Sequence, residues 1–367
     1  MSEAAARPRP AQTKGTPDQD SVTGQSSLPF DLAIVVVSWN TRDILADCLR
    51  SVEAEFEDSR LSGRLWVVDN ASTDGTVTML RRDFPQVALI ACAENLGFAA
   101  ANNVALKAIG FVDAAREPGP PPAIGQTGPQ RLESPLPDAV LLLNPDTKLH
   151  PGTLRRLTEF MQSTPRAGLV GTRLVFGDGS FQHSAFAFPG VWQLAIELLP
   201  VPGRLLESAL NGRYPRQLYD SGQAFKVGHP LGAAMCVRRE AIEQVGFLDE
   251  GFHMYVEEID WSLRLKAGGW EAYCLPEAVI THYGGQSTGQ IRTRSFVQLW
   301  TSRHRFYRKH YGPRKVWLAG QIVQLGMKRL ALRDNRAAAR GELSESERAE
   351  RTAGYEQVVR IWQNKDK

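Results

Sequence analysis

Short apolar runs alternate with amphipathic segments along the first half of the chain. Each run is rich in β-branched residues, ends in polar residues and is followed by a helix-like stretch. The four runs cover residues 32–37, 65–68, 87–90 and 139–143. After the first run, apolar residues between 44 and 52 recur at the spacing of one helix face. This alternation predicts the α/β class, with a single Rossmann-like, mostly parallel sheet flanked by helices.

Polar residues follow these runs, at the strand ends where open α/β sheets bind ligands. Asp69 follows the second run, Asn95 lies in the loop after the third, and Asp146 follows the fourth. The first run leads into Ser38 and Asn40 without a GxGxxG segment, which weakens a dinucleotide-binding interpretation. The sequence therefore predicts a ligand site of another kind at the carboxyl edge of the sheet.

Two segments contain too few large apolar residues to offset the entropy of an ordered chain. Residues 1–29 are expected to form a disordered tail, and residues 113–138 a flexible Pro/Gly-rich insertion. We expect one domain over residues 30–300 and a basic helical extension over residues 301–367.

Composition narrows the class of protein. A chain of 367 residues with 43% hydrophobic content can bury a sizeable core, and a formal charge of +3 implies no nucleic-acid partner by itself. The four cysteines form no Cys-x-x-Cys pair, which argues against a zinc module or a disulfide-stapled secreted scaffold. The N-terminus lacks a signal-peptide core, and no apolar run reaches the roughly 20 residues of a membrane span. We therefore expect a reduced, cytoplasmic setting.

Asp146 follows an almost wholly apolar strand, in the tetrapeptide Asn-Pro-Asp-Thr. A carboxylate delivered to a sheet edge can bind a divalent metal. Asn, Pro and Asp are also common turn formers, so the tetrapeptide alone favours a turn or capping role.

Three acids, Glu257, Glu258 and Asp260, open a helix that is expected to end near Gly268. Acids are stabilised at any helix N-terminus, but three within four residues exceed what capping needs. Asp260 can pair with Arg264 at the i,i+4 spacing, whereas Glu258 points in another direction. Glu258 is therefore the candidate general base.

His282 stands after a short apolar segment and before two glycines. It could supply a nitrogen ligand to a metal, although a lone histidine is more often a hydrogen-bonded structural residue. Because the candidate acids Asp146, Glu257 and Glu258 occur in the same chain, His282 is a candidate metal ligand.

Together, these segments resemble glycosyltransferase family 2, particularly its bacterial rhamnosyltransferase-like members, which have a GT-A fold. The resemblance runs from about residue 33 to residue 311. It is carried by ordered blocks: IVVVSWN (34–40), VVDNASTDGT (67–76), NLGFAAANN (95–103), LLLNPDT (141–147), residues 230–264, and residues 281–287.

The resemblance implies a nucleotide-sugar site. Asp69 would contact the nucleotide base, and Asn95, Gly97, Phe98 and Asn103 would shape the donor pocket. Asp146 matches the last acid of the family's DxD element, which binds metal and diphosphate. Asn144 stands where that element has its first acid, so Asp146 and His282 are the implied ligands of Mg²⁺ or Mn²⁺. The candidate substrate-binding residues are Ser38, Asn40, Asp69, Asn70, Asn95, Gly97, Phe98, Asn103, Asp146 and Trp261.

The resemblance also implies direct displacement at the anomeric carbon with inversion. Glu257 and Glu258 stand where the family has a Glu-Asp pair, whose second acid is the base, so Glu258 takes that role with Glu257 as the fallback. The subgroup implies dTDP-rhamnose among dTDP- and UDP-sugar donors. Two interpretations of residues 183–219, which include Trp192, are equally supported. The segment could recognise the acceptor, or it could form an ordinary helical core.

The C-terminal part is strongly basic. Between residues 301 and 340, eleven Lys or Arg stand against one acid, Asp334, which gives a local charge of about +10. Apolar residues interspersed over 316–332 predict a basic amphipathic helix. Such a helix could lie on the anionic inner face of the plasma membrane and meet a lipid-linked glycan acceptor. Alternatively, it could pack on the domain with a solvated basic side. The aromatic residues follow no nucleic-acid-binding module.

Two other functions compete with the transferase. A nucleotide-sugar-binding protein without catalysis would keep Asp69 but need not keep Asp146 or Glu258. A nucleotidyltransferase would need a Gly-rich phosphate loop near the first strand, which is absent. The sequence therefore favours an enzyme that transfers a sugar.

Overall fold

The computed structural model describes residues 30–59, 61–114, 135–284 and 292–363. The expected tail, most of the expected insertion over 113–138 and residues 285–287 of the last sequence block lie outside the described residues. The strands are β1 (Asp31–Ser38), β2 (Ser62–Asp69), β3 (Ala88–Ala91), β4 (Ala139–Leu143), β5 (Thr147–Leu149), β6 (Ala167–Val175), β7 (Phe181–Gln182), β8 (Ala185–Phe186), β9 (Phe225–Val227), β10 (His229–Pro230), β11 (Ala234–Arg238) and β12 (Glu271–His282). The helices are α1 (Arg42–Ser59), α2 (Thr76–Asp83), α3 (Phe98–Ile109), α4 (Thr153–Ser163), α5 (Val191–Leu198), α6 (Arg216–Asp220), α7 (Arg239–Val245), α8 (Glu257–Ala267), α9 (Arg292–His310), α10 (Pro313–Ala339) and α11 (Glu345–Gln363), with short 3₁₀ turns at Gly203–Leu205 and Ala209–Asn211.

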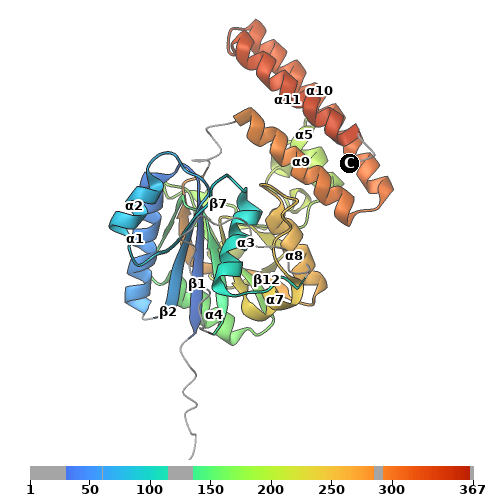
Figure 1. The fold of residues 1–367 in the computed structure, drawn as a ribbon. Coiled ribbons are helices and arrows are strands. Elements are labelled where there is room, and N and C mark those ends of the chain that lie inside the picture. The colour runs from blue at the N-terminus through green and yellow to red at the C-terminus, as the bar shows by residue number, and fades with distance from the viewer. Residues whose placement is uncertain (1–29, 60, 115–134, 285–291, 364–367) are drawn as a thin grey trace, which may run out of the picture.

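A single large sheet forms the centre of the molecule, in the strand order β3-β2-β1-β4-β11-β6-β12-β5 (Figure 1). Strands β3, β2, β1 and β4 run parallel, and they are the four runs that the sequence predicts. Strand β11 lies antiparallel between β4 and β6, and β6 and β12 run parallel to each other. The predicted α/β class, a sheet flanked by helices, is confirmed.

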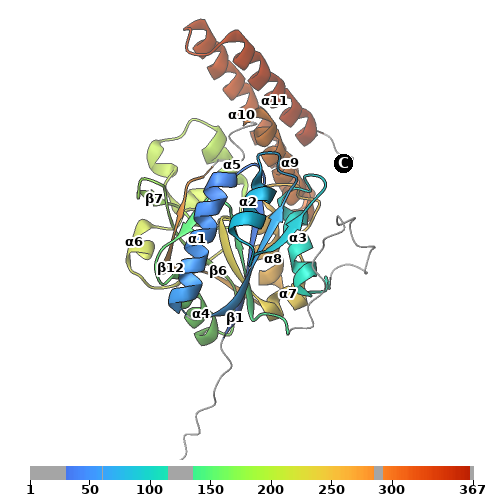
Figure 2. The same cartoon turned by 60° about the vertical axis from the view of Figure 1, so that its left-hand side comes forward.

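Both faces of the sheet are covered, which explains the nearly continuous apolar runs. Alternate residues of β1 belong to two different core clusters: Leu32, Ile34 and Val36 to one, and Ala33, Val35 and Val37 to the other. Helices α1, α2 and α4 pack on the first face, and α3, α7 and α8 on the second. Figure 2 shows α1 and α2 in front of the sheet.

The connections leave a crevice at the carboxyl ends of the parallel strands. From β1 the chain proceeds to β2 and β3 on one side, and it then returns to add β4 on the other side of β1. Ligands of open α/β sheets bind at such a switch point. The segments after β1, β2 and β4 therefore meet at one place.

Strand β12 changes register against β6 partway along its length. Leu275 pairs with Thr172, whereas Val279 pairs with the next residue of β6, Arg173, so residues 276–278 form a bulge. Beyond this bulge, β12 pairs antiparallel with β5, and His282 stands opposite Thr147. This pairing brings His282 beside the segment that follows β4.

Helices α9, α10 and α11 form a helical extension at one end of the molecule (Figure 1). Their own apolar cluster includes Trp300, Val323 and Trp362, and the Trp362 indole donates a hydrogen bond of 3.1 Å to the Trp300 carbonyl. Helix α10 contains the predicted amphipathic segment: it buries one face against α5, α9 and α11 and exposes the opposite face. In the described residues, no helix combines the length and the apolar character needed to cross a membrane.

An ion-pair cluster joins α8 to α9. Asp260 is fully buried, and its carboxylate accepts hydrogen bonds from Arg264 at 2.8 Å and from His310 at 2.7 Å, while Lys309 lies 2.7 Å away. Burial opposes ionisation, but these donors hold the pKa of Asp260 below its usual value. The predicted pairing of Asp260 with Arg264 is confirmed.

Candidate active site

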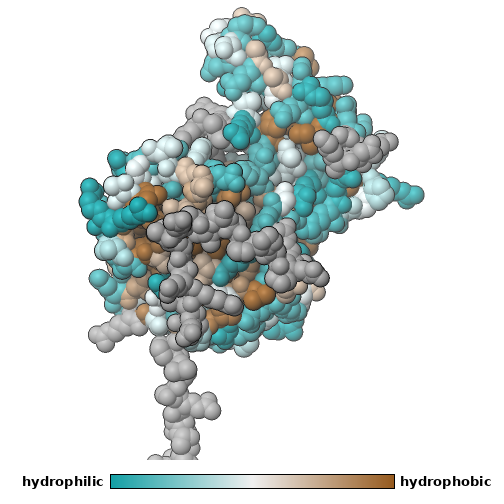
Figure 3. Space-filling model, in the orientation of Figure 1, coloured by the Kyte–Doolittle hydropathy of each residue, from teal (hydrophilic) through white to brown (hydrophobic). Residues whose placement is uncertain are grey.

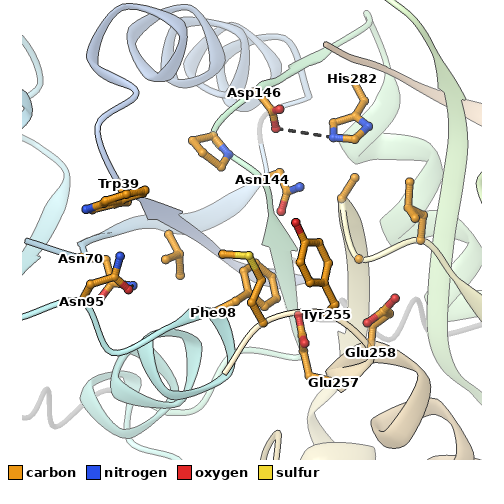
Figure 4. Close-up of a pocket in the computed structure, with 16 residues that line it drawn as sticks. Trp39, Asn70, Asn95, Phe98, Asn144, Asp146, Tyr255, Glu257, Glu258 and His282 are labelled. Carbon is orange, nitrogen blue, oxygen red and sulfur yellow. Dashed lines mark hydrogen bonds and ion pairs between the residues drawn. The ribbon is translucent and has the colours of Figure 1, made fainter. Parts of the chain in front are cut away.

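The carboxyl ends of the parallel strands open on a cavity of about 270 Å³ (Figure 4). Seven of the predicted site residues line it: Asn70, Asn95, Phe98, Asp146, Glu257, Glu258 and His282. They come from segments that lie far apart in the sequence, so the sheet topology assembles them. The remaining lining is formed by Val37, Trp39, Asn144, Pro145, Leu231, Gly232, Ala233, Met254 and Tyr255.

Asp69 lies at the end of β2, where only 1% of its surface is exposed. One carboxylate oxygen accepts a hydrogen bond of 3.0 Å from the Ser72 amide. The other oxygen is buried and has no hydrogen-bond partner among the residues that the structure describes. A buried acceptor without a partner is costly, so Asp69 is suited to receive an N–H donor from a ligand.

The segments around Asp69 support each other through side-chain amides. Asn70 donates a hydrogen bond of 3.0 Å to Asn95, and the Leu96 amide donates to the Asn70 side chain at 2.8 Å. Asn40 accepts a hydrogen bond of 2.8 Å from the Thr73 amide. Ser38 is buried, its hydroxyl bonds to Thr41, and its carbonyl accepts a hydrogen bond of 2.8 Å from the Asn70 amide. Ser38 and Asn40 thus hold the loop after β2 without lining the cavity.

Gly97 allows two loops of the cavity to touch. Its φ angle is +82°, and a Cβ there would lie 2.2 Å from the carbonyl oxygen of His253. Beside it, the Phe98 amide donates a hydrogen bond of 2.8 Å to the same carbonyl. Only glycine fits, so this position links the loop before α3 to the loop before α8.

We expect Gly97→Ala to lower kcat/KM by about 100-fold, because the methyl group must displace the His253 carbonyl and the catalytic loop with it. The melting temperature should fall by about 5 °C or more. Steady-state kinetics and circular dichroism on heating measure the two effects. Gly179→Ala is the matched control, since Gly179 has φ +80° but no atom within 4 Å of the added methyl. Full turnover by Gly97→Ala would show that the contact between the loops is dispensable.

Glu257 and Glu258 occupy the first turn of α8. Glu257 is 5% exposed, and Glu258 is half-buried. Burial raises the pKa of Glu258 to about 7. Burial, and then the charge of Glu258, raise the pKa of Glu257 well above its ordinary value. Near neutral pH, Glu258 is therefore the member of the pair that loses its proton first.

The loop before α8 holds a strained backbone. Tyr255 and Val256 have φ angles of +68° and +74°, a conformation that costs non-glycine residues of order 1–3 kcal/mol each. Val256 is buried in the cluster with α9, and the Ser302 hydroxyl donates to the Met254 carbonyl at 2.8 Å. Packing against α9 thus fixes the backbone that presents Glu258. The sequence gives no sign of this conformation.

Asp146 and His282 face each other on the side of the cavity opposite the glutamates (Figure 4). The His282 Nε2 atom lies 3.5 Å from an Asp146 carboxylate oxygen. The Tyr283 amide donates to the Asp146 carbonyl at 2.9 Å. The Gln182 amide nitrogen lies 3.1 Å from His282 Nδ1, and the Gln182 amide oxygen lies 3.3 Å from it. With Nδ1–H donating to the Gln182 carbonyl oxygen, Nε2 would be left free for a metal ion.

These residues fit a divalent cation shared with a ligand. Within the described ranges, no group of three or more His, Cys, Asp or Glu side chains could hold a metal ion. Asp146 and His282 supply two donor atoms on one cavity wall. Mg²⁺ is commonly held by one or two protein ligands together with substrate phosphates and water. A diphosphate in the cavity would complete the shell, so the site suits a metal that binds with its substrate.

Six predicted substrate-binding residues do not line the cavity: Ser38, Asn40, Asp69, Gly97, Asn103 and Trp261. The last two support a loop. Asn103 is buried, and its amide donates hydrogen bonds to Leu248 at 2.9 Å and to Glu250 at 3.0 Å. Trp261 is fully buried, and its indole donates to the Gly246 carbonyl at 2.9 Å. In the structure, both residues support the loop over residues 246–250 behind the wall.

Sequence reasoning assigned no role to several residues that line or support the cavity. Trp39 follows β1 directly, and an aromatic residue at that strand end is a signal that could have identified it. Gln182, on β7, lay in no motif and is recognised only through its contact with His282. Trp192 of the 183–219 segment is 71% exposed on α5 and does not line the cavity, so acceptor recognition there stays a prediction.

Comparisons with known proteins agree with this geometry. A family model described as "Glycosyltransferase like family 2" matches residues 29–309. The N-acetylglucosaminyl-diphospho-decaprenol L-rhamnosyltransferase of Mycobacterium tuberculosis is 30% identical over 224 residues, which cover 61% of this chain and 67% of the relative. The low-salt glycan biosynthesis hexosyltransferase Agl10 of Haloferax volcanii is 24% identical over 245 residues, covering 66% and 64%.

A solved structure shares the fold. The mannosyltransferase PcManGT from Pyrobaculum calidifontis, in complex with GDP-Man and Mn²⁺, has a TM-score of 0.50 and 16% sequence identity. The match covers 93% of this chain and 91% of that chain. The predicted GT-A fold is thereby confirmed.

Proposed function

Since the chain belongs to glycosyltransferase family 2 and is a glycosyltransferase, as the resemblance predicts, we propose that it is an inverting, metal-dependent enzyme with Glu258 as its base. One observation carries the proposal. Glu258, with a pKa raised to about 7, shares a single cavity with the carboxylate of Asp146. Glu258 can accept a proton on one wall, and Asp146 can help to bind phosphate on the opposite wall. This arrangement suits transfer of a sugar held between the two walls.

The proposed reaction is an in-line displacement at the anomeric carbon. The acceptor oxygen forms the new glycosidic bond while the bond from the anomeric carbon to the phosphate oxygen breaks. The acceptor proton goes to the Glu258 carboxylate, and the bonding electron pair leaves with the nucleoside diphosphate. Because attack and departure take place on opposite faces of the carbon, the anomeric configuration inverts.

Asp146 and His282 would hold Mg²⁺ or Mn²⁺ at the diphosphate. A divalent cation supplies positive charge that offsets the charge of the leaving diphosphate. Asp69, with its unpartnered buried oxygen, would accept a hydrogen bond from the nucleotide base. By accepting a hydrogen bond from Nδ1–H through its amide oxygen, Gln182 would hold His282 in the tautomer that binds metal.

We propose dTDP-rhamnose as the donor and a lipid-linked glycan as the acceptor. The mycobacterial relative is named for transfer of L-rhamnose to a sugar linked through diphosphate to decaprenol, which supports both choices. A lipid-linked acceptor would place the enzyme on the cytoplasmic face of the plasma membrane as a peripheral protein. We further propose residues 30–300 as the catalytic domain and residues 301–367 as its basic helical extension.

A donor panel tests this function. The purified protein is given radiolabelled dTDP- and UDP-sugars with bacterial membrane extract, with and without Mn²⁺ or Mg²⁺. We expect transfer from dTDP-rhamnose that requires the metal, and an inverted anomeric configuration in the product by NMR spectroscopy. Donor binding without transfer to any acceptor would favour a non-catalytic binding protein. Formation of nucleotide-sugar from a nucleoside triphosphate and a sugar phosphate would identify a nucleotidyltransferase.

A further inference from the structure

The outward face of α10 carries a row of exposed leucines. Leu318, Leu325 and Leu332 follow each other at intervals of seven residues, and their exposed fractions are 43%, 56% and 59%. A seven-residue spacing returns to nearly the same side of an α-helix, so the row runs for about 21 Å along one face. Trp317, which is 64% exposed, lies beside the row at its N-terminal end. Figure 3 shows hydrophobic residues among hydrophilic ones on the helical extension.

The charge around this row has one sign. The exposed charged residues of α10 are all cations: Arg314, Lys328, Arg329, Arg333 and Arg336. The single acid of the helix, Asp334, is 2% exposed and accepts hydrogen bonds from Tyr355 at 2.8 Å and from Arg333 at 3.0 Å. Positive charge therefore flanks the row of leucines near its two ends, and residues 316–327 between them carry no charge. This is the composition of helices that lie in an anionic lipid interface.

Packing of α10 against the rest of the protein does not explain its exposed leucines. The residues of α10 that pack inward are Ala319, Gly320, Val323, Gly326 and Met327, on the opposite side of the helix. The helix is therefore already held by α5, α9 and α11 without its leucine row. The row is free to contact a partner.

A second copy of the chain fits this face less well than a lipid surface. A heptad seam needs apolar residues at two positions of each repeat. Here the leucines alternate along the helix with Gln321 and Lys328, and a two-fold partner would bring like charges together. Anionic headgroups, in contrast, complement every exposed charge of the helix.

The extension lies on the same side of the molecule as the active-site cavity. In both ribbon views, β1 runs from the far end of the sheet towards the end that carries α10 and α11 (Figures 1 and 2). The cavity opens at the carboxyl end of β1. A membrane beneath the extension would therefore lie near the site rather than behind it.

We propose that the outward face of α10 is a docking surface for anionic lipid bilayers, with the leucine row at the level of the acyl chains and the flanking cations on the headgroups. This proposal rests on the peripheral position suggested above and assigns the surface that produces it. The contact is sensitive to salt, because the cationic part is screened within a Debye length.

The test is co-sedimentation of the full chain with vesicles of phosphatidylcholine alone and with 30% phosphatidylglycerol. We expect binding to the anionic vesicles only. Leu325→Ser/Leu332→Ser should lower the apparent partition coefficient by about tenfold or more. Lys328→Gln/Arg336→Gln should lower it by about 25-fold at low salt. Val112→Ser/Phe176→Ser is the matched control, since it removes two exposed apolar residues, 65% and 42% exposed, from the catalytic part.

Three results would overturn the docking proposal. They are equal binding by the leucine variant and the wild type, binding that ignores phosphatidylglycerol, and a dimer in sedimentation velocity that the leucine variant converts to a monomer. Vesicle binding requires no turnover, and transfer to a short water-soluble acceptor requires no vesicles. Failure of docking and failure of the proposed transferase reaction are therefore distinguished.

Discussion

Replacing Glu258 with glutamine is expected to lower kcat by about 1,000-fold, with donor binding within a few-fold of the wild type. Glutamine keeps the size of the side chain but cannot accept the acceptor proton, and positioned bases contribute about 10²–10⁴-fold. The carboxylate lies on the wall opposite Asp146, so its loss leaves the diphosphate side of the cavity intact. Single-turnover transfer and calorimetric titration with the nucleotide measure the two quantities.

The pH dependence gives an independent readout of the same role. Burial raises the pKa of Glu258 to about 7, and the base acts only when ionised. For the wild type, kcat/KM should therefore rise with pH up to about 7 and level off above it. Glu258→Gln should show low activity without this rise.

Glu257→Gln is the matched control for Glu258→Gln. The pKa of Glu257 is raised well above its ordinary value, so this side chain stays protonated near neutral pH and glutamine imitates it. We expect its kcat within about tenfold of the wild type. If Glu257→Gln lost transfer and Glu258→Gln kept it, Glu257 would be the base instead of Glu258.

Asp146→Asn is expected to lower kcat/KM by about 1,000-fold or more. The substitution removes the only negative charge of the proposed metal pair, because its partner His282 binds as a neutral ligand. Mn²⁺ should then no longer tighten binding of the nucleoside diphosphate. Electron paramagnetic resonance of Mn²⁺, titrated with and without dTDP, reports this loss without any turnover.

The control for Asp146→Asn is Asp178→Asn, which neutralises an exposed acid in a surface turn. It should leave both Mn²⁺ binding and transfer unchanged. Transfer by Asp146→Asn at the wild-type rate in the presence of a chelator would show that the enzyme needs no metal.

The parallel half of the sheet could be predicted because its strands are buried on both faces. Such strands give continuous apolar runs, and β4 was located with its full bounds. The acids at the start of α8 could also be predicted, because the start of a helix and its charge pattern depend on the local sequence. Local sequence therefore places Asp146 just after β4 and Glu258 in the first turn of α8.

Features that depend on contacts between distant parts of the chain could not be predicted from the sequence. Tyr255 and Val256 adopt positive φ angles because α9 packs on their loop, and neither residue type favours that conformation. Asn103 and Trp261 stand in motif blocks, yet the fold uses their polar atoms to hold a loop behind the cavity. A motif position thus indicates that a residue matters to the site without saying whether it touches the ligand.

The bulge of β12 determines which face of the sheet His282 occupies, and so whether His282 can face Asp146. Residues 276–278 add an odd number of positions before His282, and side chains of a strand alternate between its two faces. A deletion of one residue in this bulge would turn the imidazole to the opposite face of the sheet, even though every residue of the pair is kept. In aligning this chain with others, an insertion or deletion between residues 275 and 279 is therefore as informative about metal binding as a substitution of His282 itself.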